Sequence, residues 1–234
     1  MTDPRVDELR AGLEQTRERI ARACRDAGRD PGEVTLVVVT KTWPADDVER
    51  LAALGVRDVG ENRDQEAAPK AAATQGLGLT WHFIGQLQSN KAASVARYAD
   101  LVHSVDRPSL VAALDKGAAK ADRRVDCLIE VNLDPQPTEG RGGVAIDDVG
   151  EVAAAIAAAP HLRLRGVMGV APLGGDPAAA FAALARVAGE VRATYPDADI
   201  MSAGMSDDLE AAVAAGATHL RVGSAILGTR LIRR

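Results

Sequence analysis

The sequence has 234 residues, of which 47% are hydrophobic but only 3% aromatic, and its formal net charge is −5. The negative charge gives no support for binding to nucleic acid or to an anionic membrane surface, and no stretch approaches the ~20 apolar residues that span a bilayer. Because the chain has two cysteines and a charged start without an apolar run, we expect a cytoplasmic protein without a disulfide framework.

The start of the chain predicts a long helix. Asp3 is a suitable helix N-cap, and Pro4 follows it at the first helical position, where proline is tolerated. Leu9 and Leu13 would lie on one face of this helix, and Gly28 stands where a glycine often ends one. We therefore expect residues 1–30 to form a leading helix.

After this helix, two patterns alternate along the chain. Short apolar segments rich in β-branched residues predict buried strands at residues 35–40, 58–60, 81–84, 101–105, 125–133, 164–170, 199–202 and 219–222. Segments with helical spacing follow at residues 45–54, 63–73, 89–97, 109–121, 146–159, 177–194 and 207–215, and a short turn follows at 224–227.

Eight strand–helix units of this kind predict a closed (β/α)8 TIM barrel over residues 35–228, within a single domain of residues 1–234. Such alternation builds a parallel sheet, because each parallel crossover needs a covering helix. Eight units over roughly 200 residues lie at the small end of the range for this fold. A doubly wound open sheet is the alternative, although no G-x-G-x-x-G follows the first strand.

In such a barrel, functional residues lie at the C-terminal ends of the strands and in the loops that follow. The candidates are Lys41, Asn62, His82, Met168, Ser202, Met205, Ser206, Arg221, Gly223 and Ser224. Asn62 would bond a ligand oxygen or cap the next helix. His82 would face the barrel interior or the mouth, and a lone histidine is more often structural than functional. The four histidines show no metal-ligand spacing, and no Ser-His-Asp arrangement stands at the strand ends.

The loops after the seventh and eighth strands predict a phosphate site. SAGMS (202–206) and RVGSAI (221–226) both place glycine and serine where a strand turns into a helix. Glycine lets the backbone approach an anion, serine adds a hydroxyl, and a helix start offers unpaired N–H groups. Alternatively, Ser206 and Ser224 only cap short helices. Asp207 and Asp208 would repel a phosphate unless their side chains point outward.

Lys41 follows the first strand and faces this site across the expected mouth of the barrel. A lysine whose charge is disfavoured by burial or by neighbouring cations attacks carbonyl groups and forms a Schiff base. Pyridoxal phosphate combines an aldehyde with a phosphate and suits both features. The alternative is an ordinary solvated lysine at a strand end.

Arg221 leaves the eighth strand beside the expected phosphate site. It would pair with the phosphate or donate to the pyridine nitrogen of a bound cofactor. Because a guanidinium group only donates hydrogen bonds, the ring nitrogen would stay unprotonated in the second case. The ring would then be a poor electron sink, and carbanion chemistry would be weak.

These residues lie in motifs that resemble those of the YggS/PROSC family of pyridoxal phosphate homeostasis proteins. The motifs are VTKT (39–42), GEN (60–62), WHFIGQLQSNK (81–91), GVM (166–168), SAGMSDDLEAAV (202–213) and RVGSAILG (221–228). The resemblance implies a barrel like the N-terminal domain of alanine racemase, with pyridoxal 5'-phosphate held as an internal aldimine on Lys41. It implies that Ser206, Gly223 and Ser224, with their neighbours, hold the phosphate, and that Arg221 lies at the pyridine nitrogen.

The resemblance also implies a carrier or buffer of the cofactor that affects amino-acid and keto-acid balance, without firmly established catalysis. The chain departs from the family at Gln86, where proline is usual, and at Arg141, where lysine is more frequent. Neither change involves Lys41.

Two functions of different classes fit these features, namely a pyridoxal phosphate enzyme such as an amino-acid racemase, and a binding protein that stores and delivers the cofactor. A racemase needs a second acid/base opposite the lysine, but the two tyrosines, Tyr98 and Tyr195, are expected on helices that cover the barrel. A sugar-phosphate enzyme would need paired carboxylates at the strand ends, where Glu61 stands nearly alone. We therefore expect a monomeric pyridoxal phosphate carrier that contacts apoenzymes transiently, with a weakly active racemase as the alternative.

Overall fold

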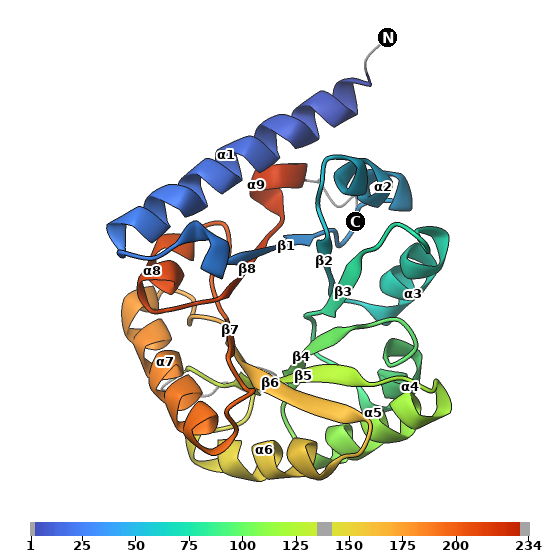
Figure 1. The fold of residues 1–234 in the computed structure, drawn as a ribbon, viewed down its shortest axis with the longest axis vertical. Helices are drawn as coiled ribbons and strands as arrows, with labels where there is room; N and C mark the ends of the chain where they lie inside the picture. The colour runs from blue at the N-terminus through green and yellow to red at the C-terminus, as the bar shows by residue number, and fades with distance from the viewer. Residues whose placement is uncertain (1–2, 135–141, 230–234) are drawn as a thin grey trace.

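The computed structural model describes residues 3–134 and 142–229. Within these ranges, eight parallel strands close into a barrel in chain order, with the first strand paired to both the second and the eighth (Figure 1). The strands are β1 (Thr35–Val39), β2 (Asp58–Glu61), β3 (Thr80–Phe83), β4 (Leu101–Val105), β5 (Val125–Val131), β6 (Leu162–Gly169), β7 (Ile200–Ser202) and β8 (His219–Val222). The predicted barrel is confirmed, and the open sheet is excluded by the pairing of β1 with β8.

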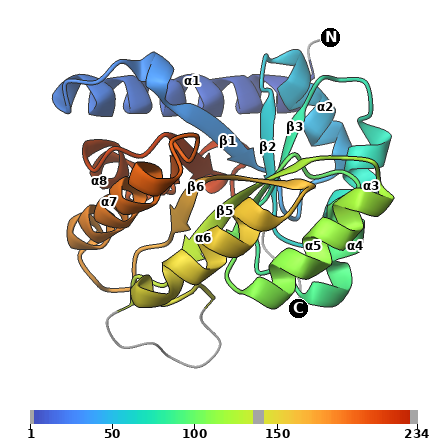
Figure 2. The same ribbon diagram turned by 60° about the horizontal axis from the view of Figure 1, so that its bottom comes forward.

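Helices surround the barrel on its outer side (Figures 1 and 2). The α-helices are α1 (Pro4–Asp26), α2 (Ala45–Ala53), α3 (Asp64–Ala73), α4 (Ala92–Val95), α5 (Pro108–Lys120), α6 (Val149–Ala158), α7 (Pro177–Thr194), α8 (Leu209–Ala214) and α9 (Ser224–Leu227). Short 3-10 helices are η1 (Pro31–Glu33), η2 (Ser89–Lys91) and η3 (Ile146–Asp148). Arg141 lies outside the described residues.

The fourth helix is shorter than predicted. Residues 89–97 divide into η2 and the single turn of α4, and the chain then turns through Tyr98 toward β4. The Tyr98 ring packs edge-on against Trp81, with 6.4 Å between ring centroids. The Asp100 N–H donates to the Trp81 carbonyl at 2.8 Å. These contacts with β3 bend the chain away before a longer helix can form.

Helix α1 covers the side of the barrel where β1 and β8 meet, and both ribbon views place it there (Figures 1 and 2). It contacts α8, α9 and α2, and it buries Leu9 and Leu13. A side chain at Gly12 would meet the Ile226 carbonyl oxygen at 2.7 Å, so the two backbones approach closely there. Because α9 has only four residues, α1 takes over the covering role of a longer eighth helix.

Successive residues of each strand point alternately to the helices and to the barrel axis. The main core lies between strands and helices, where Val38, Val59 and Phe181 are fully or almost fully buried. A smaller apolar cluster of Leu101, Leu128 and Met168 is separate from it. Six polar residues of the described strands are also buried: Glu61, His82, His103, Ser104, Ser202 and Arg221. The described strands therefore bury polar as well as apolar side chains.

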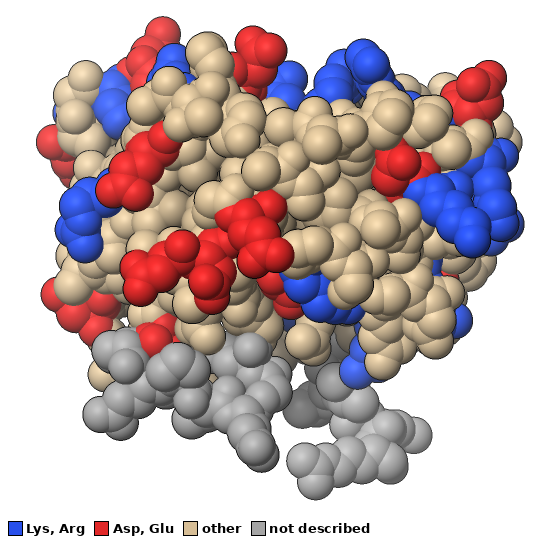
Figure 3. All heavy atoms as spheres, turned by 90° about the horizontal axis from the view of Figure 1, so that it is seen from below, with Lys and Arg blue, Asp and Glu red and all other residues tan. Residues whose placement is uncertain are grey.

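The outer surface carries both signs of charge. On the face seen in Figure 3, a group of acidic side chains lies near the centre and a group of basic ones at the right edge. No continuous basic surface covers the described residues of this face. None of the helices within residues 3–134 and 142–229 is both long enough and apolar enough to cross a membrane.

Candidate functional site

The C-terminal ends of the strands open into a cavity of about 510 Å³. Most of the predicted site residues line this cavity, namely Lys41, Asn62, Met205, Ser206, Arg221, Gly223 and Ser224. Val39, Ile84 and Val170 supply apolar walls. An apolar cavity with a few convergent polar groups is the usual form of a small-molecule site.

Lys41 lies at the tip of a turn that follows β1. The Trp43 N–H donates to the Thr40 carbonyl at 3.1 Å, so Lys41 and Thr42 occupy the centre of the turn. Thr42 has a φ of 69°, a left-handed conformation that is strained for a β-branched residue. The Lys41 side chain is exposed and has no hydrogen bond or ion pair among the described residues. The turn therefore presents a free primary amine to the cavity.

A buried ion pair anchors the strand end behind this turn. Lys70 Nζ lies 2.6 Å from Glu61 Oε1 and donates to the Thr40 carbonyl at 2.8 Å. The Thr40 hydroxyl donates to the same Glu61 oxygen at 2.7 Å. Burial raises the pKa of Glu61, while the bonds from Lys70 and Thr40 oppose that shift. Because Glu61 is directed to Lys70 on α3, it acts as an anchor and does not line the cavity.

The two serine-containing loops come together as predicted. Ser206 Oγ lies 3.2 Å from Ser224 Oγ, although the residues belong to different strand–helix units. A side chain at Gly223 would lie 3.0 Å from the Val39 carbonyl oxygen, so glycine allows the loop to pack against β1. The Asp208 carboxylate accepts a bond from the Met205 N–H at 2.6 Å and is thereby engaged within its own loop. The pair of hydroxyls forms a small cradle at the cavity wall.

Two arginines of α1 support the same wall. Arg19 Nη1 donates to the Ser206 carbonyl at 2.6 Å, and its guanidinium also bonds to Glu210. Arg5 Nη2 donates to the Leu227 carbonyl at 3.1 Å, and its guanidinium lies 4.4 Å from the ring centroid of Trp43, which lines the cavity. The sequence analysis missed these residues, because charged positions on the polar face of a helix do not indicate their partners.

Arg221 lies at the floor of the cavity and is only 5% exposed. It donates to Ser202 Oγ at 2.6 Å and to the Gly169 carbonyl at 3.0 Å. Burial lowers the pKa of Arg221 to about 10, and the nearby carboxylates of Glu130 and Asp208 oppose this shift. Arg221 therefore remains a cation at neutral pH, with N–H groups left for a ligand.

Three predicted site residues, His82, Met168 and Ser202, do not line the cavity. Met168 packs with the small apolar cluster, while His82 and Ser202 are at most 2% exposed. Both polar residues are linked through His103, which the sequence analysis did not single out. Asn62 lines the cavity and does not cap α3, whose N-cap is Arg63 without a side-chain bond. The capping alternative for Asn62 is therefore wrong.

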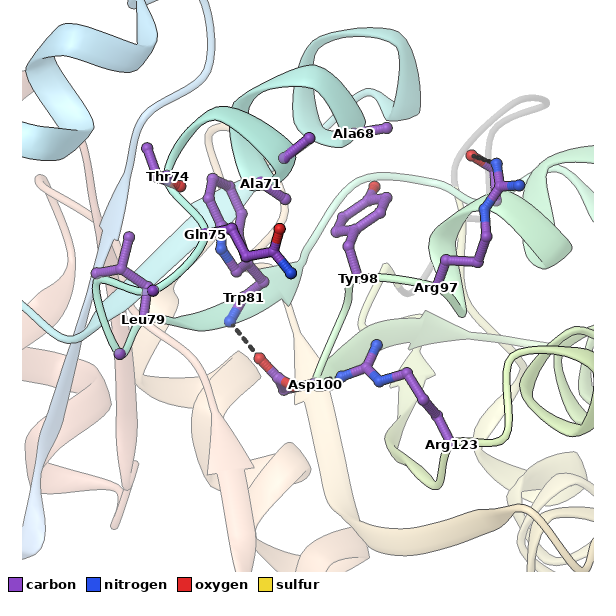
Figure 4. Close-up of a pocket in the computed structure, with 14 residues that line it drawn as sticks. Ala68, Ala71, Thr74, Gln75, Leu79, Trp81, Arg97, Tyr98, Asp100 and Arg123 are labelled. Carbon is purple, nitrogen blue, oxygen red and sulfur yellow. Dashed lines mark hydrogen bonds and ion pairs between the residues drawn. The ribbon is translucent and has the colours of Figure 1, made fainter.

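Both tyrosines lie away from the mouth, although they follow helices instead of lying within them. Tyr195 ends α7, and Tyr98 follows α4. Tyr98 borders a larger cavity of about 780 Å³ outside the barrel, beside α3 (Figure 4). Arg123 in that cavity is bonded to the Asp100 carboxylate and to two backbone carbonyls. No lysine occurs among the described residues that line it.

Within the described ranges, no group of three or more His, Cys, Asp or Glu residues is arranged to hold a metal ion. The polar groups that line the mouth cavity are the Lys41 amine, several hydroxyls, the Asn62 amide, the Asp207 carboxylate and the buried Arg221 guanidinium group.

Comparison with known proteins relates the whole chain to one group. The model of the alanine racemase N-terminal domain matches residues 12–231. A pyridoxal phosphate homeostasis protein of Mycobacterium tuberculosis (strain ATCC 25618 / H37Rv) is 42% identical, with 98% of this chain and 95% of that protein covered. The protein of the same name from Escherichia coli (strain K12) is 37% identical, with coverage of 96% and 98%. The structure of PipY of Synechococcus elongatus PCC7942 with PLP bound has a TM-score of 0.78 and 35% identity, and covers 89% of this chain and 100% of PipY.

Proposed function

Because the chain belongs to the alanine racemase N-terminal domain family, and within it to the pyridoxal phosphate homeostasis proteins, we propose that its mouth cavity binds pyridoxal 5'-phosphate. The protein would hold this cofactor and deliver it to other proteins inside the cell. The observation that carries the proposal is that one cavity unites the free amine of Lys41 with the paired hydroxyls of Ser206 and Ser224.

The residues of the cavity fit the chemical groups of this cofactor. The two serine hydroxyls and the close backbone at Gly223 suit a phosphate, and Arg221 offers donors to a ring nitrogen. The apolar side chains of Val39 and Ile84 suit the faces of a planar ring. When bound, pyridoxal phosphate supplies an aldehyde that condenses reversibly with a primary amine. Among the described residues, Lys41 is the lysine that lines this cavity, together with the cradle of Ser206 and Ser224.

Storage and delivery suit this arrangement better than racemisation does. Arg221 is a cation at neutral pH and donates hydrogen bonds, so it leaves the ring nitrogen of the ligand unprotonated and limits carbanion stabilisation. Both tyrosines lie outside the barrel, away from a position opposite Lys41. A weakly active amino-acid racemase remains the second candidate, since the family model is that of a racemase domain.

The first test is cofactor retention by purified protein. Wild type, Lys41→Ala and the control Lys120→Ala, which changes an exposed lysine of α5, are incubated with pyridoxal phosphate and freed of excess. We expect a near-visible absorption band in wild type and in the control but not in Lys41→Ala. Borohydride should then fix a mass increase on the peptide that contains Lys41. If Lys41→Ala retains the band, Lys41 is not the attachment site; if wild type retains none, the proposed function fails.

A racemisation assay on the loaded protein separates the two candidates. Conversion of L-alanine at a rate comparable to that of dedicated racemases would overturn the carrier.

We further propose that the protein acts as a monomer, because one chain supplies all the described residues of the cavity. Light scattering of loaded and unloaded protein tests this. Transfer of bound cofactor to an unrelated apoenzyme, measured as recovered activity, tests transient delivery.

A further inference from the structure

A continuous chain of hydrogen bonds crosses the barrel interior beneath the cavity. Asp58 Oδ1 lies 3.0 Å from His82 Nε2, and His82 Nδ1 lies 2.9 Å from His103 Nε2. His103 Nδ1 lies 2.9 Å from Ser202 Oγ, which accepts from Arg221 Nη1 at 2.6 Å. The two histidines and the serine are at most 2% exposed. Water therefore contributes little to fixing these side chains.

This chain joins the two ends of the barrel. Asp58 is the first residue of β2, and its side chain is 28% exposed at the N-terminal end of the strands. Arg221 is near the C-terminal end of β8 and lines the cavity. The residues between them come from β3, β4 and β7, so five strands contribute one residue each. A side-chain network of this extent needs all its groups satisfied.

The two ends of the chain determine the direction of every bond in it. The Asp58 carboxylate can only accept, so Nε2 of His82 carries a hydrogen and its Nδ1 accepts. His103 must then donate from Nε2 and accept at Nδ1, where the Ser202 hydroxyl donates. The Arg221 guanidinium group can only donate, and it donates to the lone pair that remains on Ser202 Oγ. With neutral histidines, this is the arrangement that satisfies all four contacts.

An extra proton in the interior would reverse the inner bonds. A doubly protonated His82 would donate to His103, which would then donate to Ser202. The ring centroid of His219 lies 6.1 Å from that of His82, and the Arg221 cation opposes a proton on the buried His103. Burial, with a smaller contribution from the Arg221 cation, holds the pKa of His103 well below its usual range. Burial lowers the pKa of His219 to about 4.

Arg221 is held by neutral acceptors, which makes the direction of these bonds important. Its bonded partners are the Ser202 hydroxyl and the Gly169 carbonyl, and no carboxylate of the described residues lies within ion-pair distance of it. A serine hydroxyl by itself can rotate and turn its hydrogen toward the guanidinium group. The bond from Ser202 to His103 prevents this rotation.

We propose that Asp58, His82 and His103 are positioning residues, which form a one-directional relay that keeps Ser202 an acceptor and fixes the Arg221 guanidinium group as a donor at the cavity floor. The relay also links the buried cation to a carboxylate at the opposite end of the barrel. The effect of the relay on cofactor retention rests on the proposed function. The direction of the hydrogen bonds within the relay does not.

The direction of the relay is tested on protein without ligand. Long-range ¹H–¹⁵N correlation spectra of histidine-labelled protein distinguish the two neutral tautomers from the cation. We expect both His82 and His103 to carry a hydrogen on Nε2 and none on Nδ1. Arginine-labelled protein should show slowly exchanging guanidinium hydrogens of Arg221. A hydrogen on Nδ1 of either histidine in wild type would overturn the proposal.

Variants at the exposed end of the relay test its effect on Arg221. Asp58→Leu removes the terminal acceptor of the relay, whereas Asp58→Asn keeps an oxygen that can accept a hydrogen bond. Asp199→Leu is the matched control, because Asp199 precedes β7, pairs with Arg165 and is not part of the relay. We expect guanidinium exchange at Arg221 to quicken about tenfold in Asp58→Leu, as for loss of a bond linked to a charged group. Asp58→Asn should fall between Asp58→Leu and wild type, and Asp199→Leu should match wild type.

Cofactor retention gives the second readout. Asp58→Leu should release pyridoxal phosphate about tenfold faster while Lys41 stays the attachment site. Unchanged tautomers and unchanged Arg221 exchange in Asp58→Leu would overturn the relay, as would a control that behaves like Asp58→Leu. If wild type itself retains no cofactor, the proposed function fails, and the ligand-free spectra still decide on the relay.

Discussion

Removing the cation of the buried Glu61–Lys70 pair should destabilise the fold strongly. Lys70→Met keeps most of the side-chain volume but leaves the fully buried Glu61 carboxylate with the hydrogen bond from the Thr40 hydroxyl. The change deletes the contact of Lys70 Nζ with Glu61 Oε1 at 2.6 Å and the hydrogen bond from Lys70 Nζ to the Thr40 carbonyl at 2.8 Å. Breaking one side of a buried pair costs about 3–5 kcal/mol, so we expect a loss of this size at pH 7.

The loss should depend on pH, because the pKa of Glu61 in the folded protein lies above its ordinary value of 4.5. Above pH 4.5, the folded state then binds more protons than the unfolded state, and stability falls as the pH rises through the folded pKa. Lys70 opposes this upward shift. Without Lys70 the pKa rises further, so the deficit of Lys70→Met should be smaller at pH 5 than at pH 8.

Urea denaturation at pH 5, 7 and 8 measures these free energies of unfolding, provided that their slope against urea concentration is the same in each variant. The double variant Glu61→Leu/Lys70→Met should recover most of the loss, since an apolar pair can replace a buried ion pair at little cost. Lys120→Met, on the exposed face of α5, should stay within about 0.5 kcal/mol of wild type. A deficit below about 1 kcal/mol at pH 8, or one that does not vary with pH, would refute this account of the pair.

Two further predictions concern packing and reactivity. Gly12→Val should lower the stability by about 1–3 kcal/mol, because its side chain would collide with the backbone of Ile226 on α9; a thermal melt that matches wild type would show that α1 and α9 are not in close contact. Cys24 and Cys127 are both buried, and burial raises the pKa of each thiol, so a chromogenic disulfide reagent should label them only in denaturant, and rapid labelling of the native protein would contradict their burial.

The barrel could be predicted from the sequence because its signals are local. Helix 177–194 has its N-cap at Asp176 and proline at its first position, and it lies where it was predicted. The region 89–97 was predicted as one helix, but contacts of Tyr98 and Asp100 with β3 shorten it. Such contacts depend on strands that are not neighbours in the sequence, so periodicity within one segment does not reveal them.

The loops that meet at the site could be predicted from the sequence, but the distance of each residue below the mouth could not. The fold rule places the loops after β7 and β8 side by side, and Ser206 meets Ser224 there. How far below the mouth a residue lies depends on register between strands. Ser202 pairs with Met168 on β6 and with His219 on β8. Arg221 lies on β8 two residues beyond His219, and therefore nearer the mouth than Ser202. That register arises from the closed sheet as a whole, so Ser202 was placed at the site although it lies beneath it.

The position of α1 has a consequence for the order in which the protein is made. Synthesis produces α1 first, yet its arginines bond to Ser206 and Leu227, which are 187 and 222 residues away. Contacts of such sequence separation form slowly, because a long loop must close before they are made. A chain still on the ribosome therefore lacks the cradle wall that α1 supports, and the proposed cofactor site stays incomplete until β8 and α9 have emerged.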